Sequence, residues 1–245
     1  MKQTQLTAGT RWPYKARQLD CFSTAHLNGK LYAFGGDDGN CKLGNNILMA
    51  LDLVSLKWEH LSGTSDLKPK NDEPGLREHA AIWAVPRQRK LYMMYGQANR
   101  QQAFFNRTPH GAQTDHVYYD IWAFDIDTKR WGQLKLRGNY PGARTEIAYT
   151  HSEKLGRSFI YGGYHPEMST MSDSTFMFKY SYFSDTYVFD PETLLWKQVL
   201  VRGFPSYRAA ASLVVDEDTG KLFMYGGYVN NDFVRNAFIE WAKCH

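Results

Sequence analysis

The chain has 245 residues, of which 43% are hydrophobic, 22% charged and 15% aromatic, and its formal net charge is +4. This length fits one large domain or two small ones, and the high aromatic content is unlike that of a disordered chain. The 29 Lys and Arg residues are scattered, which argues against a nucleic-acid-binding surface, and the apolar runs are too short to span a membrane.

The N-terminal segment 1–16 is predicted to precede the main folded region. It opens with a polar stretch, Met1 to Thr10, that lacks the apolar core of a secretory signal. The cysteines, Cys21, Cys41 and Cys244, are too few and odd in number for a disulfide framework. We therefore expect a cytoplasmic location, with the nucleus as the alternative.

Four segments of the chain share one spacing, from an arginine to the glycine that ends an aromatic-rich strand. The spacing is 19 residues each time (36 − 17, 96 − 77, 163 − 144 and 227 − 208), and the segments are Arg17 to Gly36, Arg77 to Gly96, Arg144 to Gly163 and Arg208 to Gly227. Three of them end in Gly-Gly, whereas the second ends in Tyr95-Gly96. A spacing that recurs along the chain indicates a repeat architecture.

A second constant follows the glycine in the first three segments. A short strand ends in Asp, and a Trp stands six positions later, in the pairs Asp52 and Trp58, Asp125 and Trp131, and Asp190 and Trp196. An Asp at the start of a turn accepts backbone N–H bonds from the residues that follow, so each pair predicts a hairpin. Each unit is thus predicted to have four antiparallel strands, A to D: A holds the arginine, B ends in glycine, C ends in Asp and D carries the Trp.

The two spacings together resemble the kelch family, over roughly Arg17 to Trp241. The resemblance implies an all-β, kelch-type β-propeller with one four-stranded blade per unit. Four blades are recognisable, at about 17–61, 77–134, 144–199 and 208–245. The fourth reaches strand C at 236–241 without its own hairpin. Either a strand from Gln5 to Trp12 closes a four-bladed ring, or the ring is incomplete and part of a larger propeller.

The repeated arginines support two interpretations. As equivalent positions they would form a ring near one face, suited to a carboxylate- or phosphate-bearing ligand such as an acidic peptide. Alternatively, each arginine bonds loop carbonyls or a carboxylate within the propeller, and Glu78 and Glu146 are the nearest acidic partners in the sequence.

The connections between strands B and C differ in length. From the glycine to the following Asp there are 16 residues in unit one (52 − 36), 29 in unit two (125 − 96) and 27 in unit three (190 − 163). In an antiparallel meander these connections share a face with the D–A linkers. Long loops on a rigid scaffold are where binding residues concentrate.

The long connections are rich in aromatic and basic residues, and aromatics with arginine are the residue types that dominate interface hot spots. The aromatic residues in them include Tyr118, Tyr119, Phe176, Phe178, Tyr180 and Tyr182. The alternative is that these aromatics only extend strands B and C. The candidate partner-binding residues are Arg17, Arg77, Arg144, Arg208, Arg100, Phe104, Phe105, Arg107, Tyr164, His165 and Phe183.

The function predicted from these features is that of a protein–protein interaction scaffold. It would bind a protein partner, with an acidic peptide as the candidate class, and neither nucleic acid nor a membrane. The alternative is a metal-dependent enzyme that resembles galactose oxidase or the iron-dependent specifier proteins. The histidines are dispersed, although His110, Asp115 and His116 share one loop and His165 and Glu167 the next. No metal-binding or nucleophile motif is present, so we expect no catalytic residues, no metal site and no cofactor.

Overall fold

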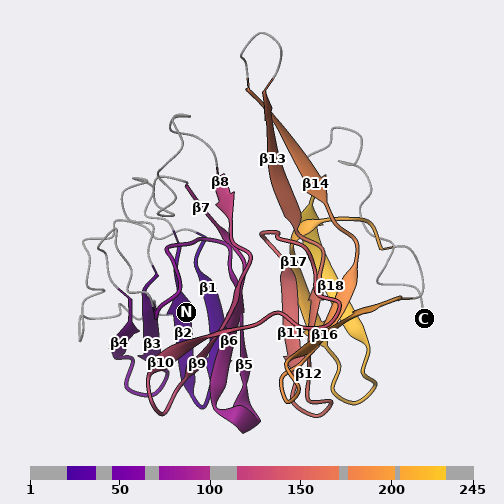
Figure 1. Cartoon of the computed structure of the whole chain (residues 1–245). Helices are drawn as coiled ribbons and strands as arrows, with labels where there is room; N and C mark the ends of the chain where they lie inside the picture. Colours follow the sequence, from indigo (N-terminus) through magenta and orange to yellow (C-terminus); the bar gives the residue numbers. More distant parts are fainter. Residues whose placement is uncertain are drawn as a thin grey trace, which may run out of the picture.

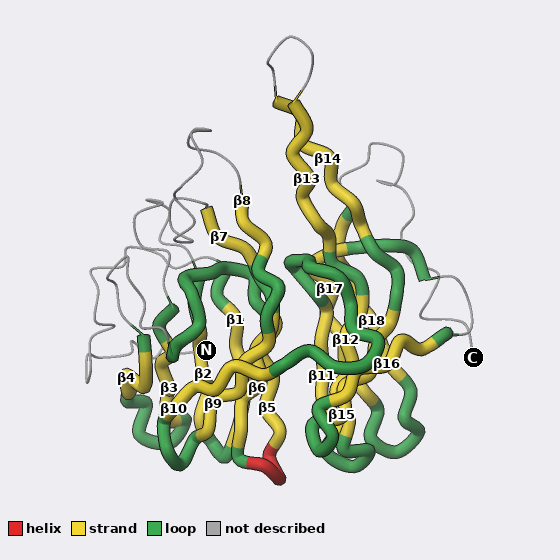
Figure 2. The backbone as a smooth tube through the Cα atoms, in the orientation of Figure 1, coloured by secondary structure: helices red, strands yellow, loops and turns green. Residues whose placement is uncertain are grey.

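The computed structural model describes residues 21–36, 46–63, 72–99, 115–170, 176–201 and 205–229. These residues form three four-stranded and three two-stranded sheets, all antiparallel (Figure 1). The only helix among them is a single 3-10 turn, η1 (Pro86–Gln88), at the end of strand β5 (Figure 2). None of the described helices is long and apolar enough to cross a membrane. The fold is all-β, as predicted.

Each four-stranded sheet is a meander of the predicted strands A to D. The first consists of β1 (Ser23–Leu27), β2 (Lys30–Phe34), β3 (Leu48–Asp52) and β4 (Trp58–Ser62). The second consists of β5 (Ala81–Val85), β6 (Lys90–Met94), β9 (Ile121–Asp125) and β10 (Arg130–Leu134). The third consists of β11 (Ala148–Ser152), β12 (Arg157–Tyr161), β15 (Thr186–Asp190) and β16 (Leu195–Val199). Strands β17 (Ala209–Val215) and β18 (Leu222–Tyr228) form the A and B strands of a fourth unit.

The C–D hairpins form by the predicted mechanism. The Asp52 Oδ1 accepts the backbone N–H groups of Val54 and Ser55, at 3.1 and 2.7 Å. Asp125 and Asp190 make the equivalent pairs of bonds at the ends of β9 and β15. Each carboxylate thereby satisfies two amides that the ladder leaves unpaired, which fixes where strand C ends.

The first strands of successive sheets lie side by side: β1 beside β5, β5 beside β11, and β11 beside β17. The A strands are therefore innermost and the D strands outermost, as in the blades of a propeller. One departure from the prediction concerns the arginine, which stands before strand A and not within it: Arg77 and Arg144 each precede their strand by four residues.

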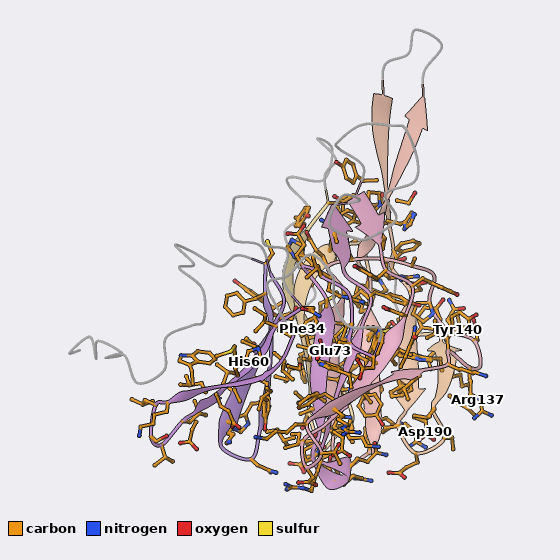
Figure 3. All side chains as sticks on the ribbon, turned by 60° about the vertical axis from the view of Figure 1, so that its left-hand side comes forward. Phe34, His60, Glu73, Arg137, Tyr140 and Asp190 are labelled. Carbon is orange, nitrogen blue, oxygen red and sulfur yellow. The ribbon has the colours of Figure 1, made fainter. Side chains whose placement is uncertain are left out.

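The core lies between adjacent sheets. Phe34 of the first sheet (labelled in Figure 3) and Phe124 of the second both contact Trp131, with ring centroids 5.5 and 5.1 Å away. The Trp131 indole N–H donates to the Ser62 hydroxyl at 2.8 Å. Trp196 stacks on Phe189 between the second and third sheets. Trp131 and Trp196 thus fill the gaps between blades, as large apolar bodies in a core are expected to do.

One face of the fourth unit has no cover among the described residues. Val214, Phe223 and Tyr225 are 58%, 56% and 78% exposed. The glycines that end strand B are 67 residues apart between units two and three (163 − 96) and 64 apart between units three and four (227 − 163). By these offsets Phe223 is equivalent to Tyr92, which is buried against the third sheet. The segments that were predicted to extend this blade or close the ring, 236–241 and 5–12, lie outside the described residues.

Candidate functional site

Both long B–C connections contain a β-ribbon. Strand β7 (Gln97–Asn99) pairs with β8 (Asp115–Val117), and β13 (Tyr164–Thr170) pairs with β14 (Phe176–Tyr182). The two ribbons rise from the same end of the sheets, and η1 lies at the opposite end (Figures 1 and 2). We call the end that carries the ribbons and the D–A linkers the loop face.

Arg77 fastens the base of the first ribbon. It is 1% exposed, and its guanidinium makes two bonds to the Asp120 carboxylate, at 2.6 and 2.9 Å. It also donates to the carbonyls of Tyr95 and Gly75, at 2.9 and 3.1 Å. The Tyr118 ring covers the guanidinium at 3.6 Å. A bidentate carboxylate with a stacked ring is the arrangement in which an arginine is most firmly held.

Arg144 repeats this arrangement in the third sheet. It is 2% exposed and bonds Asp185 at 2.5 and 3.2 Å. The carbonyls of Gly162 and Gly142 each accept from it at 3.1 Å. The Phe183 ring lies 3.8 Å from the guanidinium carbon. The repeat therefore preserves a complete clamp that joins the linker, the end of strand B and the start of strand C.

The clamps correct the predicted pairing of the arginines. Glu78 and Glu146 are not their partners: the acids are Asp120 and Asp185, each five residues before the Asp that ends strand C. The two buried ion pairs, Arg77 with Asp120 and Arg144 with Asp185, give these arginines a structural role. That Arg77 and Arg144 also bind a ligand stays a prediction.

Arg208 occupies the same position in the fourth unit. It donates to the carbonyls of Gly226 and Ser206, at 2.9 and 3.3 Å. Its own carbonyl accepts the N–H of Gly163, from the preceding blade, at 2.8 Å. Between the first and second blades, Gly36 donates to the Arg77 carbonyl at 3.0 Å. The arginine backbone therefore joins one blade to the next.

The first sheet has no aspartate at the clamp position. The position is occupied by Ile47, which is fully buried and whose backbone carbonyl accepts the N–H of Gly35 at 3.1 Å. The backbone carbonyls of Asp120 and Asp185 make the same bond to the N–H groups of Tyr95 and Gly162. An apolar side chain therefore stands where the other two blades have a carboxylate.

The arginine register also differs in the first unit. The β1–β2 hairpin has two connecting residues, 28–29, whereas β5–β6 has four, 86–89. Four residues before β1 the sequence has Leu19, and Arg17 is two residues further back. The equal 19-residue spacing in unit one therefore does not reflect equal register. Arg17 itself lies outside the described residues.

The remaining candidates fall into two groups. Tyr164 is buried at the base of the second ribbon, with Tyr180 and Tyr182 around it at 5.7 and 5.4 Å. His165 Nδ1 lies 2.9 Å from the Ala143 carbonyl oxygen. Outside the described residues lie Arg100, Phe104, Phe105, Arg107 and His110.

Tyr119 is the most exposed aromatic side chain described at the base of the first ribbon. It is 50% exposed, and its ring stacks on buried Tyr95 at 5.8 Å. The ring of Tyr140, which is labelled in Figure 3 and lies on the linker before β11, has its centroid 5.8 Å from that of Tyr119. Burial of the hydroxyl, with a hydrogen bond to Tyr140 next in effect, raises the pKa of Tyr119 to about 12. The phenol is therefore neutral at physiological pH and available as a hydrogen-bonding, apolar contact.

A cavity of about 300 Å³ opens among the A strands at the end opposite the loop face. Trp83, Tyr149 and His151 line it. His151 lies between the Ser158 hydroxyl and the Glu153 carboxylate, at 3.0 and 3.1 Å, and burial lowers its pKa. Sequence reasoning did not find this cavity, because it depends on how separate A strands converge.

A family model of kelch repeats matches the chain. The family model described as the KLHDC2/KLHL20/DRC7 Kelch-repeats domain matches residues 7–163, which is more than half of the chain. The match includes the first two sheets and the A and B strands of the third.

Proposed function

The chain belongs to the kelch-repeat family, whose domains generally mediate protein–protein interaction, and we propose that it binds its partner on the loop face. The observation that carries this proposal is the pair of ribbons, β7–β8 and β13–β14, which rise from the same end of the sheets (Figure 1). Rigid sheets that present long connections on one face are the usual arrangement of a binding scaffold.

The bases of the ribbons offer suitable anchors. Tyr119 and Tyr180 are 50% and 42% exposed, and each packs against another tyrosine ring. Because these rings are already held by neighbours, binding a partner costs them little conformational entropy. Tyrosine is also among the residues that contribute most to interfaces.

The partner class that we propose is an acidic protein segment. The chain carries a net charge of +4, and Arg100 and Arg107 lie in the connection between β7 and β8. Phe104 and Phe105 stand between these two arginines in the sequence. A partner with carboxylates flanking an apolar side chain would match this order of groups.

The test is affinity capture from a cell lysate followed by mass spectrometry, with the full chain as bait. The variant Phe104→Ala/Phe105→Ala/Tyr119→Ala should lose proteins that the wild type retains. Leu155→Ala is the matched control, because Leu155 is 44% exposed in the β11–β12 turn at the opposite end. Equal capture by the triple variant and the wild type, with both folded by tryptophan fluorescence, would exclude the loop face as the binding surface.

A further inference from the structure

Three side chains with different metal-binding chemistry meet on the loop face. One ligand atom each from Cys21, Glu78 and His79 lies within 4.8 Å of the other two. Cys21 stands two residues before β1, and His79 two residues before β5. The cluster therefore lies at the junction of the first and second blades, and the two halves are 58 residues apart in the chain (79 − 21).

The backbone holds the two halves of the cluster together. The N–H of His79 donates to the carbonyl of Cys21 at 2.9 Å. Both residues have left-handed backbone angles, with φ of 52° and 58°. Non-glycine residues adopt this region uncommonly. The separation of the thiol and the imidazole is thus set by a hydrogen bond between blades and not by flexible side chains alone.

Neighbouring polar groups orient the ligands. Gln97 Nε2 donates to Glu78 Oε1 at 3.0 Å, which fixes the plane of that carboxylate. His79 Nε2 lies 3.6 Å from Glu146 Oε1 on the third blade's linker. A carboxylate behind a histidine is the usual outer partner of a metal-bound imidazole, since it fixes the tautomer and the ring orientation.

Glu146 is a buried acidic group next to the cluster. Its side chain is 8% exposed, and within the described part of the chain its Oε2 has no hydrogen-bond partner. Burial, and next a hydrogen bond from its hydroxyl to the Glu146 carboxylate, raise the pKa of the Tyr228 phenol, so Tyr228 stays neutral beside it. A buried carboxylate oxygen without compensation is costly. A cation held by the adjacent cluster would add a favourable interaction with the Glu146 carboxylate as a whole, through His79 on its other oxygen.

We propose that Cys21, Glu78 and His79 bind a zinc ion that ties the first blade to the second. Thiolate, imidazole and carboxylate together suit Zn²⁺, whereas Mg²⁺ and Ca²⁺ require oxygen ligands. To reach zinc–ligand distances of roughly 2.0 to 2.3 Å, each ligand atom needs to move by less than about 1 Å. Three protein ligands leave one tetrahedral position for water. Binding forms three zinc–ligand bonds, displaces water ligands from the hydrated ion and releases the thiol proton to solvent.

Cobalt titration of the purified full chain tests the assignment. Co²⁺ is the spectroscopic probe, because thiolate coordination gives it a charge-transfer absorption in the near ultraviolet. We expect one equivalent of Co²⁺ to produce this band and Zn²⁺ to displace it. Cys21→Ser should abolish the band, and the matched control Cys41→Ser should retain it. Absence of the band in the wild type, or its persistence in Cys21→Ser, would overturn the proposal.

Two further variants separate metal binding from folding. His79→Gln keeps the thiol and should weaken Co²⁺ affinity, and Glu146→Gln should weaken it by about 10- to 100-fold through loss of the outer partner. In thermal unfolding, Zn²⁺ should raise the Tm of the wild type and of Cys41→Ser, because it binds only the folded chain. The same Tm increase in Cys21→Ser, or none in the wild type, would exclude a zinc link between these blades.

Discussion

Replacement of Asp120 by isoleucine, the residue that the first blade has at this position, should strongly destabilise the fold. Arg77 is 1% exposed, and Asp120→Ile removes both carboxylate bonds from its guanidinium. Removing one partner of a buried ion pair costs about 3 to 5 kcal/mol, because the other charge stays buried and uncompensated. A domain of ordinary stability, about 5 to 15 kcal/mol, would lose a large share of its free energy of unfolding.

The double variant Arg77→Leu/Asp120→Ile should recover part of that loss. It recreates in the second blade the residue types that the first blade has at these positions, Leu19 and Ile47. The buried charge is then gone. What remains is the loss of the Arg77 bonds to the carbonyls of Gly75 and Tyr95 and of the Trp122 indole bond to Asp120, about 1 kcal/mol each. The double variant is therefore expected to be more stable than Asp120→Ile alone.

Urea unfolding followed by tryptophan fluorescence measures these differences, provided that the slope of the transition is unchanged. Asp127→Asn is the control in the same blade, because the Arg89–Asp127 pair is 2.6 Å apart but 51% and 59% exposed. It should cost less than about 1 kcal/mol. The reasoning fails if Asp120→Ile costs no more than this control, or if the double variant is as unstable as the sum of its single changes.

Three further changes test other parts of the fold. Gly96→Ala should lower the free energy of unfolding by more than about 1 kcal/mol, since φ is +87° and the new Cβ would lie 2.6 Å from a carbonyl oxygen. Gly132→Ala is the control, because there is open space around that glycine. Equal Tm values for the two variants would contradict the argument. Burial lowers the pKa of His151 below its ordinary 6.5. As the pH falls, the unfolded chain therefore protonates this histidine before the folded chain does. The stabilisation that is present above pH 6.5 is lost as the pH falls from 6.5 to the folded-state pKa. His151→Gln should therefore flatten the decline of Tm between neutral and mildly acidic pH, and an unchanged slope would refute this cause. Trp131→Phe keeps an aromatic ring but removes the 2.8 Å bond to Ser62; we expect a loss of about 1 to 2 kcal/mol in urea unfolding, and wild-type stability would show that this bond contributes nothing.

The strands and hairpins were predictable because local chemistry determines them. The Asp-to-Trp spacing specifies a turn with a hydrogen-bonding mechanism, and β3, β9 and β15 all end at the expected Asp. Glycine ends strand B where the backbone needs a positive φ, as at Gly163, with φ of +89°. Both signals act within a few residues, so a single sequence is enough to find them.

The partners of the arginines could not be chosen by proximity in the sequence. Glu78 is adjacent to Arg77, but successive residues of an extended segment point to opposite sides, and Glu78 bonds Gln97 instead. The acid that does pair, Asp120, is 43 residues away, one residue before strand C of the same blade. Its recurrence five residues before the C-strand Asp in units two and three was a usable signal.

The register of the first unit and the ribbons were harder to predict for a different reason. The A–B hairpin of the first unit is two residues shorter than that of the second. The spacing from Arg17 to Gly36 is nevertheless the same, so Arg17 is displaced by two residues relative to strand A. The lengths of the long connections were visible, but the pairing of β13 with β14 depends on cross-strand contacts. The meeting of Cys21 with His79 depends on how two blades pack. No local pattern encodes any of these.

The hydrogen bonds that the carbonyls of Arg77 and Arg208 accept between blades have a consequence for how the protein unfolds. Each belongs to a residue fixed within its own blade, yet each accepts an amide from the blade before it. In linear repeat arrays, stability divides into a sum of units that can melt one after another. Here, loosening one blade deprives its predecessor of a backbone bond as well as of apolar cover. Adjacent blades should therefore unfold together. A substitution in one arginine clamp should destabilise the neighbouring sheet as well as its own.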